Sequence, residues 1–247
     1  MPALNPELRT VRDPEELERA AAGEFARLAR QAEPKRPLAV ALSGGRTPTG
    51  MYARLAQDPY RNLVPWQALH LFWGDERHVP PDHPDSNFRT VQEALLSRIT
   101  VPEANVHRIP AENPDATAAA IDYEATLRSF FSLKEGQVPR LDLLLLGLGA
   151  DGHVASLFPG SDALREGTRL VAAPWVERLQ ARRITLTPPA IKNASEIMVL
   201  VSGEEKAGAL RQALSGAGTV DDCPALLLRE ARGRVIFIAD RAAARPM

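Results

Sequence analysis

The feature that most constrains the fold is the leucine-rich segment LDLLLLG at residues 141–147. A strand that is apolar along almost its whole length must be covered on both faces, which is typical of parallel strands between two layers of helices. The segment is much shorter than the roughly 20 apolar residues of a membrane span. It therefore predicts a buried strand inside an α/β domain.

Other short apolar segments recur along the chain and predict further strands. They lie at residues 37–43, 69–73, 183–187, 196–203 and 234–240. Helical patterns stand between them: one begins with Asp13 as N-cap and Pro14 as first helical residue, and others cover 86–98, 112–132 and 204–214. This alternation predicts an α/β fold with a mostly parallel, Rossmann-like sheet and helices on both faces. We expect a single domain over residues 1–247.

The balance of charge restricts the partners of the chain. Its 30 Lys and Arg residues are balanced by 31 Asp and Glu residues. The chain therefore has no overall positive charge that would attract nucleic acid or a membrane surface. Its one cysteine, Cys223, has no partner for an internal disulfide, and the N-terminal segment lacks the apolar core of a signal peptide. We expect a cytoplasmic protein that is either a monomer or a small homo-oligomer.

The leucine-rich segment continues into GLGADG at residues 147–152, which matches the G-x-G-x-x-G pattern of dinucleotide-binding turns. Those turns open a long helix, whereas Pro159 and Gly160 would end any helix here after about two turns. We therefore expect no nicotinamide, flavin or other cofactor. The remaining interpretations are a solvent-facing turn, or a strand end that presents Asp151 and His153 to a ligand, with the imidazole as acid or base.

A second glycine-containing turn, LSGGRTPTGMY at residues 42–52, connects a predicted strand to a predicted helix. Backbone N–H groups and the helix dipole bind anions in this geometry. Met51 and Tyr52 stand where a nucleoside triphosphatase loop needs Lys and Ser or Thr, so that class is excluded. An ordinary turn stays open beside a phosphate site. The candidate phosphate ligands are Ser43, Gly44, Gly45, Arg46 and Thr47.

Charged residues follow two more predicted strands. Asp75 and Arg77 in GDERHVPPDH either form a solvated pair or bind a sugar and its charged end. The histidines of this segment suggest a metal site, but Pro80 and Pro81 prevent the helical face that would align them, and we expect no metal.

Two further cations are candidates for a phosphate dianion. Arg183 begins the strand RITLT, and Lys206 lies in the first turn of a helix, where a lysine opposes the helix dipole. A plain surface lysine is the alternative for Lys206.

Taken together, SGGRTP, GDERHVPPDHPDSN, GLGADGHVASLFPG, RITLT and SGEEKAGAL resemble the 6-phosphogluconolactonase family in order and spacing. The resemblance covers nearly the whole chain, and GLGADGHVASLFPG is its most specific part. It implies a fold related to glucosamine-6-phosphate deaminase and ribose-5-phosphate isomerase. It also implies metal-free hydrolysis of the sugar-phosphate lactone 6-phosphoglucono-1,5-lactone to 6-phosphogluconate in the pentose phosphate pathway.

The family pattern makes His153 the base that activates water, with Asp151 orienting the imidazole or the sugar. Backbone N–H groups of the glycine turn are candidate donors to the oxyanion. Three departures from the family pattern are visible. Val154 replaces a frequent Thr, and the C-terminal strand RVIFIAD lacks a frequent Trp. Arg46 replaces a smaller residue, so the phosphate site is expected to be tighter or partly filled. A glucosamine-6-phosphate deaminase/isomerase and a non-catalytic sugar-phosphate sensor are the alternative functions.

Overall fold

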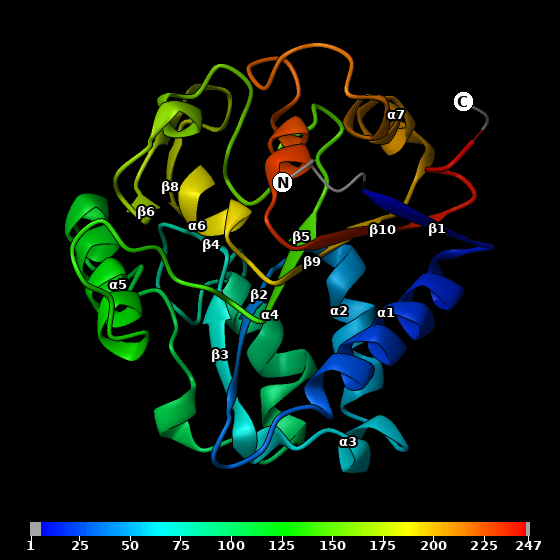
Figure 1. The fold of residues 1–247 in the computed structure, drawn as a ribbon, viewed down its shortest axis with the longest axis vertical. Helices are drawn as coiled ribbons and strands as arrows, with labels where there is room; N and C mark the ends of the chain where they lie inside the picture. Colours follow the sequence, from blue (N-terminus) through cyan, green and yellow to red (C-terminus); the bar gives the residue numbers. More distant parts are fainter. Residues whose placement is uncertain (1–5, 246–247) are drawn as a thin grey trace.

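In the computed structural model, which describes residues 6–245, a six-stranded sheet forms the centre of the molecule (Figure 1). All of its neighbouring strands pair in parallel. In spatial order the strands are β1 (Glu7–Val11), β10 (Arg234–Asp240), β9 (Glu196–Val201), β5 (Leu143–Gly147), β2 (Leu38–Leu42) and β3 (Leu69–Trp73). The predicted parallel α/β sheet is confirmed, and the leucine-rich segment forms one of its inner strands.

Helices cover both faces of this sheet. In Figure 1, α1 and α2 lie below β9 and β10, whereas α7 lies above them. The helices are α1 (Pro14–Ala29), α2 (Arg46–Leu55), α3 (Tyr60–Leu63), α4 (Asn87–Ala94), α5 (Ala116–Phe130), α6 (Pro188–Lys192) and α7 (Ala207–Ser215). Short 3₁₀ segments are η1 (Trp66–Ala68), η2 (Leu96–Arg98), η3 (Glu103–Asn105), η4 (Asp162–Arg165), η5 (Glu177–Leu179), η6 (Glu204–Lys206) and η7 (Pro224–Glu230). None of the helices in the described part of the chain is both long and apolar enough to span a bilayer.

The expected helix starts carry the expected caps. The Asp13 side chain accepts a hydrogen bond from the Glu16 N–H, and Pro14 is the first residue of α1. Ser86 caps α4 in the same way by accepting from the N–H of Arg89. These side chains satisfy N–H groups that have no partner inside the helix, and so they fix where each helix begins.

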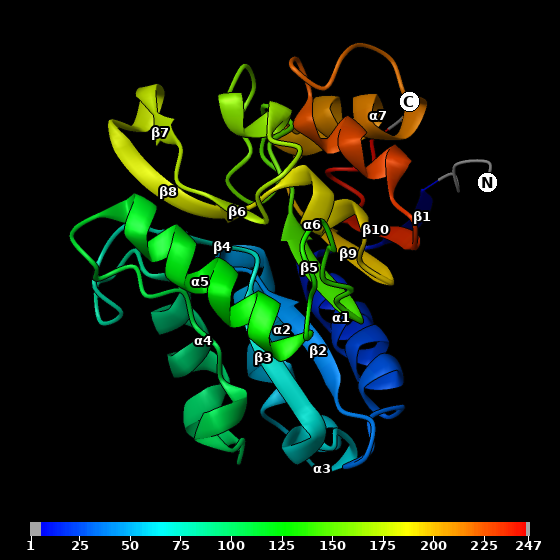
Figure 2. The same cartoon turned by 60° about the vertical axis from the view of Figure 1, so that its left-hand side comes forward.

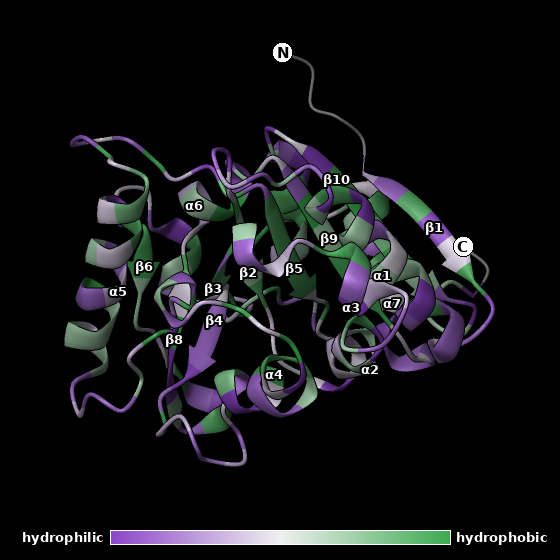
Figure 3. Ribbon diagram, turned by 90° about the horizontal axis from the view of Figure 1, so that it is seen from below, coloured by the Kyte–Doolittle hydropathy of each residue, from purple (hydrophilic) through white to green (hydrophobic). Residues whose placement is uncertain are grey.

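The core lies between the central strands and their helices. Every residue of β9 is buried, as are Leu143–Leu146 of β5. Figure 3 shows these strands as hydrophobic and the peripheral loops as mostly hydrophilic. This pattern is the one that a sheet covered on both faces requires.

A second, smaller sheet is antiparallel and lies beside the first (Figure 2). It contains β4 (Asp75–Arg77), β8 (Ala181–Leu186) and β6 (Val171–Ala172), and β7 (Trp175–Val176) pairs with the outer end of β8. Helix α5 packs against β6 and β8. The predicted strand at 183–187 therefore belongs to this sheet and not to the parallel one, because it pairs antiparallel with β4 and β6.

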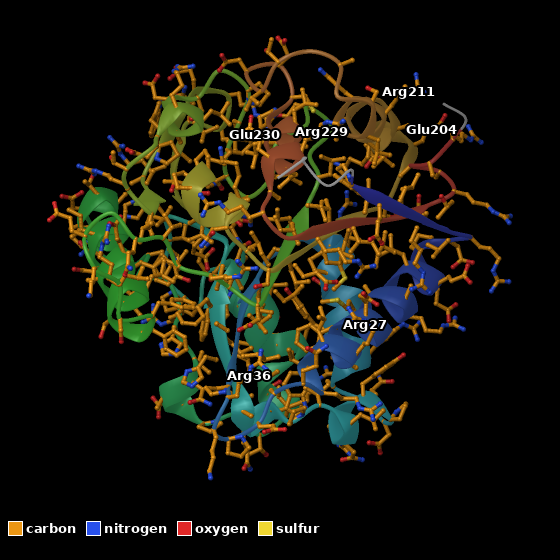
Figure 4. All side chains as sticks on the ribbon, viewed as in Figure 1. Arg27, Arg36, Glu204, Arg211, Arg229 and Glu230 are labelled. Carbon is orange, nitrogen blue, oxygen red and sulfur yellow. The ribbon has the colours of Figure 1, made fainter. Side chains whose placement is uncertain are left out.

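The parallel strands end at one edge, where several polar segments meet. Ser43 follows β2, Asp75 follows β3 after one glycine, and the glycine turn follows β5. Lys206 comes after β9. Figure 4 marks the two ends of the sheet by labelled residues: Glu204, close to the end of β9, lies in the upper part of the view, and Arg36, just before β2, lies in the lower part. Ligand sites of open α/β sheets lie at this carboxyl edge.

Candidate active site

A cavity of about 370 Å³ opens at the carboxyl edge, between the parallel sheet and the small sheet. Most of the predicted site residues line it, although they come from distant parts of the chain. These are Ser43, Gly44, Gly45, Asp75, Arg77, His153, Arg183 and Lys206. The cavity thus joins the imidazole, the glycine turn after β2 and the three predicted cations in a single space.

Three predicted residues lie outside the wall of the cavity. Asp151 stands behind His153. Arg46 and Thr47 occupy the first turn of α2, where Arg46 is exposed and does not fill the cavity. Direct phosphate contact by Arg46 and Thr47 therefore stays a prediction.

Asp151 and His153 form a tightly coupled pair. Asp151 Oδ1 lies 2.6 Å from His153 Nδ1 and 3.3 Å from the backbone N of His153. Burial of Asp151 opposes its ionisation, but the hydrogen bonds and charge of His153, together with Arg178, outweigh burial and hold the pKa of Asp151 at about 2. An ionised carboxylate only accepts, so Nδ1 carries the proton and a neutral imidazole has Nε2 free as a base.

The turn that carries this pair depends on glycine. A Cβ at Gly149 would collide with His153 Nδ1 and Asp151 Oδ1. Gly152 has a φ of +81°, and a Cβ there would press on the Sγ of Cys223. No helix forms over the described residues 153–161, which agrees with the exclusion of a dinucleotide-binding turn.

The same turn uses two of its own N–H groups internally. The Gly149 N–H donates to the carbonyl of His153 at 2.8 Å, and the Gly152 N–H donates to the carbonyl of Gly149 at 3.0 Å. The expectation that the backbone of the glycine turn supplies oxyanion donors is therefore wrong for these two residues.

An arginine that the sequence did not single out completes this side of the cavity. Arg178 lies 2.7 Å from Asp151 Oδ2, in an ion pair without good hydrogen-bond alignment. Its guanidinium is 4.6 Å from the centre of the Phe158 ring, and that ring lies 4.4 Å from the imidazole of His153. Arg178 thus contacts the acid, and Phe158 contacts both Arg178 and the imidazole.

Two arginines of the small sheet face each other on the cavity wall. Arg77 on β4 is paired directly with Arg183 on β8. Burial and then the charge of Arg77 lower the pKa of Arg183. Like charges at directly opposed positions are unfavourable, so an anion bound beside them would relieve the repulsion.

The turn after β2 offers further groups to an anion. Gly45 is the N-cap of α2 and has no side chain with which to occupy the first N–H groups of that helix. The hydroxyl of Ser43 is buried and has no hydrogen-bond partner among the described residues. Backbone and hydroxyl donors of this kind are suited to a phosphate group.

Sequence reasoning also missed the different contacts made by Asp75 and Glu76, the two acidic residues that follow β3. Glu76 is only 2% exposed, and its carboxylate accepts from the backbone N–H groups of Arg77, Asn87 and Phe88. Asp75 accepts from the hydroxyl of Ser156 at 2.6 Å. Glu76 therefore anchors the start of α4, while Asp75 and Asn87 reach the cavity.

Metal ligands are not grouped in the part of the chain that the structure covers. Within residues 6–245, no three or more His, Cys, Asp or Glu side chains are arranged to hold a metal ion. The histidines at 78 and 83 bond instead to the Asn113 carbonyl and to the Asp85 N–H.

Comparison with known families shows which family the chain belongs to. The profile described as "Glucosamine-6-phosphate isomerases/6-phosphogluconolactonase" matches residues 12–237. The chain belongs to this family. The matched residues include the glycine turns, the Asp–His pair and the four Arg and Lys residues that line the cavity.

Relatives within the glucosamine-6-phosphate isomerase/6-phosphogluconolactonase family are similar over most of their length. The chain is 41% identical to a 6-phosphogluconolactonase of Synechocystis sp., covering 83% of this chain and 82% of that protein. It is 39% identical to a 6-phosphogluconolactonase of Streptomyces coelicolor, covering 97% of this chain and 94% of that protein. The solved 6-phosphogluconolactonase structure from Trypanosoma cruzi has a TM-score of 0.88 at 32% identity and covers 100% of this chain and 98% of its own. The family resemblance seen in the motifs is confirmed.

Proposed function

We propose that the protein hydrolyses 6-phospho-D-glucono-1,5-lactone to 6-phospho-D-gluconate, a step of the pentose phosphate pathway. One observation carries this proposal: a single cavity joins the imidazole of His153, backed by an ionised Asp151, to the cations Arg183 and Lys206. A sugar-phosphate lactone has the matching groups, an electrophilic acyl carbon at one end and a dianion at the other. The named relatives support this substrate over the deaminase/isomerase and sensor alternatives.

His153 acts as general base and then as general acid. Its Nε2 removes a proton from water while the water oxygen bonds to the lactone carbonyl carbon. The tetrahedral intermediate collapses by breaking the bond from that carbon to the ring oxygen. His153 returns its proton to this oxygen, which becomes a hydroxyl of the open acid. No proton is gained or lost at the imidazole over the cycle.

Asp151 keeps the imidazole in the form that the first step needs. As a carboxylate it accepts from Nδ1–H, which leaves Nε2 unprotonated, and it stabilises the imidazolium that forms during attack. Arg178 and Phe158 hold both groups in place. This contribution is orientation and charge, since Asp151 itself stays ionised.

The 6-phosphate is anchored by other residues of the same cavity. Arg183 and Lys206 supply charge, and Ser43, Gly44 and Gly45 supply hydroxyl and backbone donors, with Arg77 beside Arg183. Binding energy from this remote group fixes the acyl carbon against His153. Unphosphorylated gluconolactone is therefore expected to be a poor substrate.

The reaction as proposed needs no metal, and we place the protein in the cytoplasm as a monomer or small homo-oligomer. Support for the metal-free route is that Asp151 engages the Nδ1 of His153, which leaves Nε2 available as the base. Support for the compartment is the single, buried thiol of Cys223.

The test is to supply freshly prepared 6-phosphogluconolactone and follow its loss above the spontaneous rate, with and without EDTA. We expect rapid, EDTA-insensitive hydrolysis and much weaker activity on gluconolactone. Equal efficiency on the two lactones would contradict the phosphate anchor. Release of ammonia from glucosamine 6-phosphate, without lactone hydrolysis, would replace the proposal with the deaminase.

A further inference from the structure

Asn87 is a buried polar residue on the cavity wall that the reaction above leaves without a role. It is the first residue of α4, and its exposed fraction is 2%. Its Nδ2 donates to the carbonyl of Asp75 at 2.9 Å. Its Oδ1 is buried and has no hydrogen-bond partner among the residues that the structure describes. Such unpaired acceptors are rare in native proteins and need an explanation.

The direction of the Asn87 amide follows from its partner. A backbone carbonyl only accepts hydrogen bonds, so the side of the amide that faces Asp75 must be the NH₂ group. The carbonyl oxygen of the side chain is therefore the atom left over. It faces Gly44, at which a Cβ would collide with it, in the turn between β2 and α2.

The neighbours of Asn87 are already committed to other bonds, and its position is rigid. Asp75 accepts from Asn87 with one oxygen and from the Ser156 hydroxyl with the other. Glu76 holds the Asn87 N–H at 2.7 Å and the Phe88 N–H at 2.8 Å. The amide cannot turn to find a partner within the protein without breaking this arrangement, so its partner must come from the cavity.

We propose that Asn87 Oδ1 accepts a hydrogen bond from a ring hydroxyl of the sugar and so determines which sugars are hydrolysed well. This inference rests on the proposed function and extends it to the recognition of the ring. The Oδ1 atom only accepts, so it repels the phosphate dianion and the lactone carbonyl oxygen. In 6-phosphogluconolactone the hydroxyls on C2, C3 and C4 are the donors that remain.

The experiment compares lactones that each lack one hydroxyl. The 2-, 3- and 4-deoxy lactones are made by oxidising the corresponding deoxyglucose 6-phosphates at C1, and kcat/KM is measured for each beside the full lactone. Removing the donor leaves Asn87 Oδ1 unpaired in a buried site, so we expect one deoxy lactone to lose about tenfold or more.

The Asn87→Ala variant shows whether that loss passes through this residue. We expect kcat/KM for the full lactone to fall to about the level of the disfavoured deoxy lactone, whose own value changes little. Asn87→Ser, with a shorter polar side chain, is expected to behave in the same way. Asn193→Ala is the matched control, because Asn193 also donates to backbone carbonyls but lies away from the cavity.

The outcomes separate this inference from the proposed function. Loss of less than about twofold for all three deoxy lactones on the native protein overturns it, whether or not the variants fold. Equal loss on all four lactones in Asn87→Ala also overturns it and leaves only a structural role. If the native protein does not hydrolyse the full lactone, it is the proposed function that fails.

Discussion

Asp151 uses its two oxygens for different partners, which makes the reactive group a unit of three residues. One oxygen binds His153 and the other pairs with Arg178. These two contacts therefore fix the orientation of the carboxylate and keep it ionised. The imidazole can then present Nε2 in one orientation. Substitutions in this unit are therefore expected to change the chemistry and not the folding.

Replacing His153 by alanine removes the proposed base. We expect kcat to fall by about 10²–10⁴-fold, the usual contribution of general acid–base catalysis, with the unfolding midpoint little changed. The control is His83→Ala, because His83 is another partly exposed histidine that does not line the cavity. Near-normal turnover in His153→Ala would remove this residue from the mechanism.

Asp151→Asn tests the role of the carboxylate. The amide of asparagine can donate to Nδ1, and the neutral imidazole would then carry its proton on Nε2, where it cannot act as a base. We expect kcat to fall by at least about 10²-fold while KM stays similar. Asp85→Asn, on an exposed carboxylate, is expected to have no such effect. A change in KM alone would assign Asp151 to substrate binding.

At the scale of elements, a buried carboxylate joins β4 to α4. Glu76 accepts from three backbone N–H groups and from the hydroxyl of Ser86, and burial raises its pKa. Both the helix start and the cavity-facing Asn87 depend on these bonds. The short strand Asp75–Arg77 thus positions a helix as well as a cation.

Glu76→Ala is expected to destabilise the fold. It leaves several buried N–H groups without a partner, which we expect to cost about 3 kcal/mol of unfolding free energy. Urea unfolding measures this value. Glu93→Ala, on the exposed part of α4, should change stability by less than about 0.5 kcal/mol. Equal effects of the two substitutions would contradict the anchoring role.

Two histidines make the stability of β3 sensitive to acid. His70 Nδ1 lies 3.0 Å from His107 Nε2, and burial lowers the pKa of both rings. The unfolded chain takes up protons at a higher pH, near 6.5, than the folded chain does. The contribution of this pair to the free energy of unfolding is therefore fully present above about pH 6.5 and is lost as the pH falls below that value.

The measurement is the free energy of unfolding at pH 7.5 and at pH 5.5. We expect the loss on acidification to be smaller in His70→Gln than in the native protein, because one of the two groups that charge on unfolding is gone. His83→Gln, at an exposed site, serves as control and should leave the loss unchanged. An unchanged loss in His70→Gln would show that the pair does not control acid stability.

At the scale of the whole molecule, one arginine joins four elements at the end of the sheet remote from the cavity. Arg234 on β10 contacts Glu7 of β1 at 2.8 Å, Glu24 of α1 at 2.6 Å and Glu196 of β9 at 2.7 Å. Arg27, labelled on α1 in Figure 4, also pairs with Glu24 and Glu196. This network ties the edge strand β1 to the core.

Arg234→Ala leaves two mostly buried carboxylates with only Arg27 to compensate them. We expect a loss of about 2 kcal/mol, below the usual cost of a fully buried pair because the Arg234 side chain is 35% exposed. Urea unfolding is the assay. Arg245→Ala, which breaks an exposed pair with Glu204, should be nearly neutral. A similar effect of both substitutions would contradict a structural role of the network.

Sequence reasoning succeeded where a local pattern is sufficient. The apolar strands, the caps and the two glycine turns follow from composition and spacing, and eight of the eleven predicted site residues line the cavity. It failed for β1, because four of the five residues of this edge strand are exposed and give no apolar signal. It also missed Asn87 and Arg178, because their importance arises only from contacts with residues distant in sequence.

The cavity lies between two sheets, one parallel and the other antiparallel. The small antiparallel sheet supplies Arg77 and Arg183, whereas the turn with His153 belongs to the parallel one. Two of the cations proposed to hold the phosphate therefore come from a different sheet than the proposed base. Substitutions in β4 or β8 can therefore alter the proposed phosphate contacts while the turn that carries His153 stays unchanged.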